Sequence, residues 1–180
     1  MSKVPRTILT LIVAFVCAGT AEAQGRKPNP IYEQTIFSGE ESFQHPVSLS
    51  PAVLKVLLKT KTAKEGLAFA SDSERSNPAQ LFRAAAMHLS KTDDIDLVVR
   101  GIGWMSGADN DWFWIVRSAH TQPRVVLFVG GNSIELMRTR TNGYCNIRSD
   151  WSSPQERRDA VYHFDGRKYK LWKEKWTPNQ

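Results

Sequence analysis

The residues most able to do chemistry, namely histidine, cysteine and closely spaced acids, are few in this chain of 180 residues and are scattered along it. Zinc sites recur at short spacings such as i and i+4 on a helix. No two of the four histidines have such a spacing; they are His45, His88, His120 and His163. The glycine-rich motifs of hydrolases, phosphate sites and dinucleotide sites are also missing. We therefore expect no cofactor, and the sequence favours a binding protein over an enzyme.

The loop at 107–111 is the most polar one, and it holds two acids two residues apart, Asp109 and Asp111. Two such carboxylates could hold a cation or act as acid and base. They are the candidates for a metal site, and for the catalytic acids of a secreted hydrolase. Asp and Asn side chains also bond their own backbone in turns. Because no distant partner residue can be named, the turn is the favoured interpretation.

The C-terminal part of the chain interleaves tryptophan with lysine and arginine. Such a mixture suits a surface for a polyanion, a glycan or a stacked base, because the cations neutralise charge and the rings make face contacts. The candidate binding residues are Trp151, Arg167, Lys168, Lys170, Trp172, Lys173 and Trp176. Strand alternation allows a plainer interpretation, in which Lys168 and Lys170 protect a solvated edge strand.

Residues 1–23 have the pattern of a cleavable secretory signal peptide. Lys3 and Arg6 are followed by an apolar stretch over 8–18 and by a small-x-small pattern at 21–23, which predicts cleavage after Ala23. The apolar stretch is shorter than the roughly 20 residues of a membrane-spanning helix. No transmembrane segment is therefore expected, and the mature protein should be secreted or periplasmic.

Cysteine usage bears on both anchoring and stability. Attachment of lipid to Cys17 is disfavoured, because Val16 stands where a small residue is needed. Cleavage leaves Cys145 alone, so no intramolecular disulfide can form and packing must stabilise the fold.

Cleavage of the signal peptide also removes two cations and one anion, which takes the formal net charge from +6 to +5. This balance would favour anionic surfaces.

The remaining sequence divides into an irregular leader over 24–47 and one globular domain over 48–180. Ser50-Pro51 resembles an N-cap followed by proline at the first helical position, and predicts a helix over about 51–60. The apolar run 112–116 is typical of a central strand covered on both faces. Strands are also predicted at 124–129 and 133–138, separated by a Gly-Gly-Asn turn.

Alternating apolar residues at 160–164 end at Asp165-Gly166, which predicts a hairpin whose second strand carries Tyr169 and Leu171. The expected class is α+β: a mainly antiparallel β meander of about six strands with an N-terminal helix packed on it.

Residues 82–99 resemble the strand-loop-strand of FG-GAP-type repeats, in which an acidic loop leads into Asp-Leu-Val-Val. In that family the loop acids can bind calcium. Here His88, Ser90 and Thr92 occupy ligand-type positions, and the loop glycines are missing. The resemblance therefore implies a hairpin without calcium.

From about residue 81 onward the chain also resembles a group of uncharacterised exported bacterial proteins. The motifs that carry this resemblance are Trp-Phe-Trp-Ile-Val-Arg at 112–117, Thr-Asn-Gly-Tyr at 141–144, and Tyr-x-Phe-Asp-Gly-x-x-Tyr at 162–169. The resemblance implies export and no known activity.

The sequence thus leads to an exported binding module of unknown ligand, with its contact surface on the basic and aromatic C-terminal hairpin. Its partner would be an anionic envelope polymer or an acidic protein, and nucleic acid is not expected because export separates the protein from it. A secreted hydrolase that uses Asp109 and Asp111, and a structural envelope component without a ligand, are the alternatives.

Overall fold

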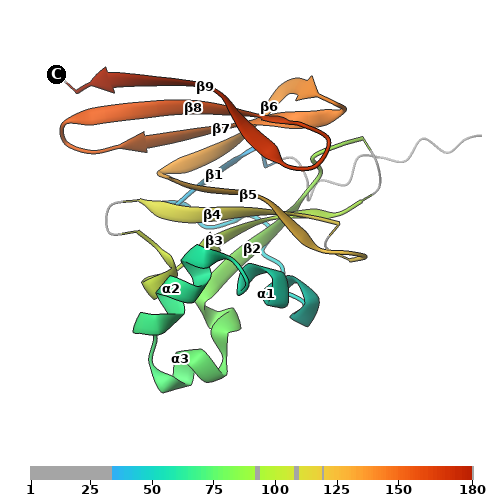
Figure 1. Ribbon diagram of the computed structural model, residues 1–180, viewed down its shortest axis with the longest axis vertical. Helices are drawn as coiled ribbons and strands as arrows, with labels where there is room; N and C mark the ends of the chain where they lie inside the picture. Colours follow the sequence, from blue (N-terminus) through green and yellow to red (C-terminus); the bar gives the residue numbers. More distant parts are fainter. Residues whose placement is uncertain (1–33, 92–93, 108–109, 119, 180) are drawn as a thin grey trace, which may run out of the picture.

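The computed structural model describes residues 34–91, 94–107, 110–118 and 120–179. The expected signal peptide, the first ten residues of the expected leader and Asp109 lie outside this range. Figure 1 shows three layers: a five-stranded sheet, a four-stranded sheet and a group of short helices. The described strands are β1 (Ile36–Ser38), β2 (Phe82–Met87), β3 (Asp96–Gly101), β4 (Asp111–Arg117), β5 (Arg124–Gly131), β6 (Ser133–Thr141), β7 (Tyr144–Ser152), β8 (Glu156–Phe164) and β9 (Tyr169–Pro178).

The four-stranded sheet lies in the middle of the molecule, with the order β2-β3-β4-β5 and antiparallel pairing throughout. Its strand β4 is buried on both faces, as the apolar run predicted. Phe113 and Ile115 pack toward the other sheet, whereas Trp114 and Val116 pack toward the helices. Since all four side chains are fully buried, this strand connects two separate hydrophobic cores.

The five-stranded sheet has the order β1-β6-β7-β8-β9, so β9 is an edge strand. Its inner face supplies Ile134, Ile147 and Phe164 to the core between the sheets. The antiparallel, β-rich class is confirmed, but the described residues form nine strands rather than about six. The expected single meander is also wrong, because the chain passes from one sheet to the other at Asn132, between β5 and β6.

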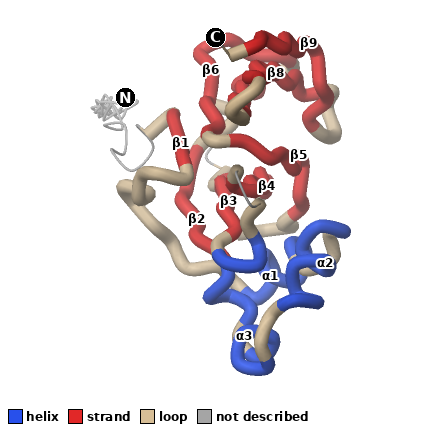
Figure 2. The backbone as a smooth tube through the Cα atoms, turned by 90° about the vertical axis from the view of Figure 1, so that its left-hand side faces the viewer, coloured by secondary structure: helices blue, strands red, loops and turns tan. Residues whose placement is uncertain are grey.

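The described helices are α1 (Pro51–Leu57), α2 (Lys61–Phe69), α3 (Asp72–Ser76), η2 (Pro78–Leu81) and η3 (Gly103–Met105). Among the described residues, α1, α2 and the short 3-10 helices η2 and η3 pack on the outer face of the four-stranded sheet, whereas α3 has no buried residue and lies away from the sheet (Figure 2). The α1 helix begins where the sequence predicted, and the Ser50 hydroxyl accepts a hydrogen bond from the amide of Val53 at 3.3 Å. Val53 and Leu57 then pack in one cluster with Trp114 of the sheet.

The segment before α1 is part of the fold, contrary to the expected irregular leader over 24–47. Phe37, in β1, is 1% exposed in the core between the sheets and meets Phe43 edge to face, with ring centroids 5.5 Å apart. Arg100 of β3 donates to the carbonyls of Ser38 and Gly39 at 2.6 and 2.7 Å, which fixes the end of β1. The globular part therefore starts before residue 48.

β2 and β3 pair as the two antiparallel strands that the sequence predicted, and Asp96, the first residue of β3, has a structural role. Asp96 is 1% exposed and accepts hydrogen bonds from the amides of Leu89 at 3.2 Å and Ser118 at 3.0 Å. Burial raises the pKa of this carboxyl, although the two amides and the nearby Arg117 oppose the shift. The carboxyl joins the ends of two neighbouring loops.

Candidate functional site

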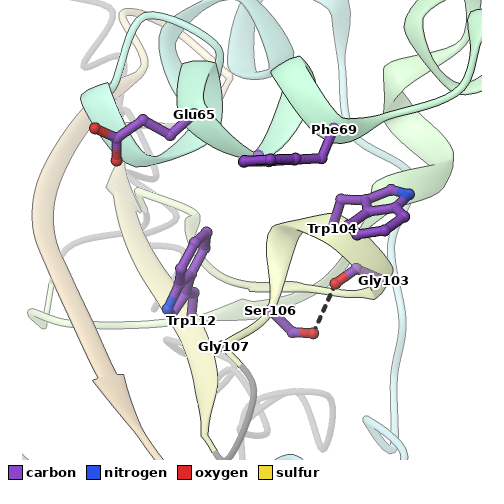
Figure 3. A pocket seen from close by; sticks show the side chains of 8 residues that line it. Glu65, Phe69, Gly103, Trp104, Ser106, Gly107 and Trp112 are labelled. Atoms are coloured by element: carbon purple, nitrogen blue, oxygen red, sulfur yellow. Dashed lines mark hydrogen bonds between the residues drawn. The ribbon is translucent and has the colours of Figure 1, made fainter.

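A cavity with an aromatic lining lies between α2, η3 and the start of β4, and we call it the aromatic pocket (Figure 3). Its volume is about 530 Å³, and it opens to solvent. Phe69 at the end of α2 and Trp104 in η3 form one side, while Trp112 and Glu65 lie on the other. A cavity of this size is within the range of small-molecule sites.

The three rings around the pocket differ in how they are held. Phe69 and Trp104 stack on one another, with centroids 6.2 Å apart and planes 28° apart, yet they remain 69% and 53% exposed. Trp112 is half-buried and meets the rings of Trp114 and Phe128 edge to face at 6.4 and 6.2 Å. The sheet therefore fixes Trp112, whereas the opposite wall presents apolar rings to water.

Glycine allows the walls of the pocket to come this close. A Cβ on Gly66 of α2 would lie 2.6 Å from the carbonyl oxygen of Trp104 and 2.7 Å from the sulfur of Met105. Gly103 begins η3 with a φ of +56°, a conformation that glycine adopts without strain. The Gly-x-Gly at 101–103 thus shapes the turn that presents Trp104, and Gly66 lets the helix rest on that turn.

The polar groups of the pocket are few. Glu65 is the one charged side chain among the described lining residues, and its carboxylate is 3.7 Å from the ammonium group of Lys61 one helical turn earlier. Ser106 donates its hydroxyl hydrogen to the carbonyl of Gly103 at 2.8 Å. The described lining of the pocket therefore combines three aromatic faces with the negative charge of Glu65.

The hairpin predicted at Asp165-Gly166 is confirmed, and it holds the predicted basic residues. The Asp165 carboxylate accepts from the amides of Arg167 and Lys168, both at 2.8 Å, and lies 3.0 Å from the ammonium group of Lys170. These contacts hold the pKa of Asp165 well below its ordinary value, with the amide of Lys168 contributing most. Gly166 has a φ of +97°, as a tight turn requires.

A β-bulge divides the predicted surface between two faces of the sheet. The register shifts between Val161 and Tyr162, so that Trp172 is the extra residue of β9. Trp172 stacks on His163, with centroids 4.4 Å apart and planes 13° apart, while Lys170 pairs with His163 and Lys173 pairs with Val161. These side chains share the outer face, where Trp172 is 63% exposed.

The other two predicted tryptophans lie on the opposite face. Trp151 and Trp176 meet edge to face at 5.7 Å, and the guanidinium of Arg158 lies over the Trp176 ring at 5.7 Å. Arg158 also pairs with Glu174 at 2.9 Å. The seven predicted residues therefore do not form one surface: Lys170, Trp172 and Lys173 share the outer face, Arg167 and Lys168 lie in the turn, and Trp151 and Trp176 face the other way.

The acidic loop proposed for catalysis is described only in part. The Asp111 carboxyl lies against the backbone of Gly39, where a Cβ would collide with it. Burial raises its pKa, and the charge of Arg100 acts in the opposite direction. Asp111 therefore contacts the residue that directly follows β1.

The histidines and Cys145 are placed as packing or surface residues. The histidines belong to four separate segments, before α1, after β2, after β4 and in β8. Cys145 is buried, and burial raises the pKa of its thiol, which keeps it protonated. Within the described ranges, no group of three or more histidine, cysteine, aspartate or glutamate side chains is placed to hold a metal ion.

Sequence reasoning missed the aromatic pocket because its rings come from three separate elements. The signal that could have indicated it was Phe69 beside a polar helix face, together with Trp104 directly after Gly103.

Among the helices of the described residues, none is both long and apolar enough to cross a membrane. Comparison with protein-family models, with curated proteins and with solved structures gives no match.

Proposed function

We propose that this protein is an exported binding module that contacts an anionic polymer of the cell envelope through the outer face of β8 and β9. We call this surface the basic stripe; it consists of His163, Lys170, Trp172, Lys173 and Lys175. The observation that carries the proposal is the bulge, because it turns Lys173 and Lys175 toward the face that Lys170 and Trp172 share. A stacked aromatic pair and three lysines then occupy one exposed row.

The charges of the basic stripe are suited to a linear polyanion. Lys173 and Lys175 form no ion pair with any described residue, and Lys170 has only the exposed partner Asp165. Lys170, Lys173 and Lys175 oppose His163, Val161 and Asp159 of β8. Alternate residues of a strand are about 7 Å apart, so the three lysines form a row of cations. One face of Trp172 rests on His163 and the other is open, which provides an apolar contact for a sugar ring.

The architecture favours this edge as the contact surface. The four-stranded sheet is covered by helices on one face and by the second sheet on the other, so neither face is open to a large partner. Lysines along β9 repel a second copy of the same edge. A partner with negative charge would instead gain from the same residues.

Binding of the mature protein to dextran sulfate, with neutral dextran as the reference, tests the proposal by isothermal titration calorimetry. The variant Lys170→Gln/Lys173→Gln/Lys175→Gln should bind about tenfold more weakly, because each exposed ion pair contributes about 0.5 kcal/mol. The matched control is a triple glutamine variant with the same change of charge on three exposed lysines at the other end of the molecule, Lys55 in α1, Lys59 in the turn after it and Lys64 in α2. It should bind almost as tightly as the parent.

Three outcomes would contradict the proposal. Equal weakening in both triple variants would show attraction to net charge alone. An unchanged affinity in the stripe variant would leave the structural envelope component as the better hypothesis. Tighter binding to poly-glutamate than to dextran sulfate would instead favour an acidic protein partner. The hydrolase alternative draws no support from Asp111, which contacts the backbone of Gly39.

A further inference from the structure

We propose that the aromatic pocket is a second binding site, which takes a small organic cation of the quaternary ammonium class. The inference is independent of the basic stripe, because the pocket lies beside the helices while β9 lies at the other end of the molecule (Figure 1). The two sites also have opposite electrostatic character. Binding at one can therefore be tested without the other.

Two rings of the pocket are exposed. Phe69 and Trp104 present their apolar faces to water, although the helices that carry them pack on a hydrophobic core. Exposed apolar surface that borders a cavity marks a contact surface. Trp112 faces them across the pocket (Figure 3). A ligand between the two walls would cover apolar surface from both sides at once.

The charge at the pocket is opposite in sign to that of the whole chain. The chain has a formal net charge of +6, whereas the charged side chain among the described lining residues is the carboxylate of Glu65. An anionic ligand would be repelled by this group, and a neutral sugar would find few hydrogen-bonding side chains besides Glu65 and Ser106. An organic cation matches both the rings and the carboxylate of the pocket, since aromatic faces attract cations and the carboxylate attracts positive charge.

The site is also largely formed before a ligand arrives. Trp112 is held by Trp114 and Phe128, and Gly66 brings α2 into contact with the turn that bears Trp104. A preformed site loses less conformational entropy on binding. Lys61 has an exposed ammonium group 3.7 Å from the Glu65 carboxylate, so it would compete with a bound cation. Such an exposed pair is weak, so a bound cation can replace it.

The methyl groups of the cation are part of the inference. A bare ammonium group is strongly hydrated and would lose that hydration against three rings, whereas a trimethylammonium group presents apolar methyls to the rings and spreads its charge. The volume of about 530 Å³ accommodates this group with a short substituent that extends into solvent.

Titration of the mature protein with choline chloride, followed by the indole N–H signals of Trp104 and Trp112 in NMR spectra, tests the site. The neutral isostere 3,3-dimethyl-1-butanol is the reference, since it has the same shape without the charge. Choline should bind at least about tenfold more tightly than this alcohol, and should perturb the two indoles at the pocket. Trp176, on the other sheet, should not respond.

Variants separate the contributions of the rings and the carboxylate. Trp104→Ala should weaken choline binding about fivefold or more, whereas Trp176→Ala should leave it unchanged. Glu65→Gln should weaken binding of choline but not of the alcohol, and Glu156→Gln, an exposed acid of β8, is its control. Lys61→Gln should strengthen choline binding, because it removes the cation that competes for Glu65.

Equal affinities for choline and the alcohol would overturn the inference and leave a simple apolar site. Saturation by glucose with no response to choline would overturn it in favour of a saccharide site. An absence of any response in protein that is folded by circular dichroism would also refute it. Because all substitutions except Trp104→Ala are at exposed polar or distant positions, a loss of binding in Glu65→Gln cannot be attributed to unfolding.

Discussion

Substitution of Phe37 by alanine tests whether the segment before α1 belongs to the folded domain. Phe37 is 1% exposed, and truncation of a fully buried phenylalanine costs about 3–5 kcal/mol through lost burial and a residual cavity. The edge-to-face contact with Phe43 is included in that cost. Since whole domains are stable by only about 5–15 kcal/mol, the change is large. For a domain of this size it corresponds to a fall in Tm of roughly 6–20 °C.

The control is the neighbouring residue of the same strand. Ile36 is 53% exposed and points to the outer face, so Ile36→Ala should cost less than about 1 kcal/mol. Urea unfolding followed by tryptophan fluorescence measures both variants, with the midpoint shifting at constant m-value. Equal free energies of unfolding for the two variants would refute the placement of β1 and restore the irregular leader expected from the sequence.

Two further predictions concern the pocket wall and the buried acid. Gly66→Ala should lower the free energy of unfolding by about 1–2 kcal/mol, although alanine has the better helix propensity, because the added methyl group would crowd Trp104 and Met105. Thermal unfolding measures this change. A stabilised variant would contradict the close contact between α2 and η3. The raised pKa of Asp96 means that the folded state holds its proton more tightly than the unfolded state, so its contribution to stability falls as pH rises from about 4 through the folded-state pKa. In Asp96→Asn this decline should disappear from urea midpoints measured between pH 4 and 7, and an unchanged pH profile would show that the carboxyl titrates normally.

The features that the sequence predicted correctly are those set by local chemistry. Ser50-Pro51 starts a helix because a hydroxyl and a fixed φ act within one turn, and Asp165-Gly166 makes a hairpin because its bonds span three residues. The run at 112–116 is apolar at every position, as a strand covered on both faces requires. None of these inferences needed knowledge of a distant residue.

The features that were missed depend on contacts between distant segments. β1 has three residues, too few for a periodic pattern, and its role appears only when Phe37 meets the second half of the chain. The Gly-Gly-Asn turn at 130–132 was predicted, but whether a turn pairs two strands or leads to another sheet is decided by packing. Asn142-Gly143 lay in a recognised motif, and its turn chemistry could have indicated the hairpin of β6 and β7.

The candidate sites were predictable only in part, for the same reason. Strict alternation separates Lys170 from Leu171 correctly, but a bulge at Trp172 reverses the alternation beyond it, and no residue type announces a bulge there. The split of Trp176 from Trp172 follows from that one inserted residue, whereas the face of Trp151 is set by the pairing of β7 with β8. The pocket rings share no spacing at all, because they meet only after α2 packs on η3.

The pairing of β1 with β6 has a consequence for the order in which the fold can assemble. β2 to β5 pair with their neighbours in sequence, as do β6 to β9, so each sheet can grow by closing short loops. Ile36, by contrast, pairs with Glu135, and that strand cannot form until most of the chain is present. If the protein is exported as we propose and its N-terminus crosses first, β1 is the first of these strands to cross and must wait for β6 before it can pair.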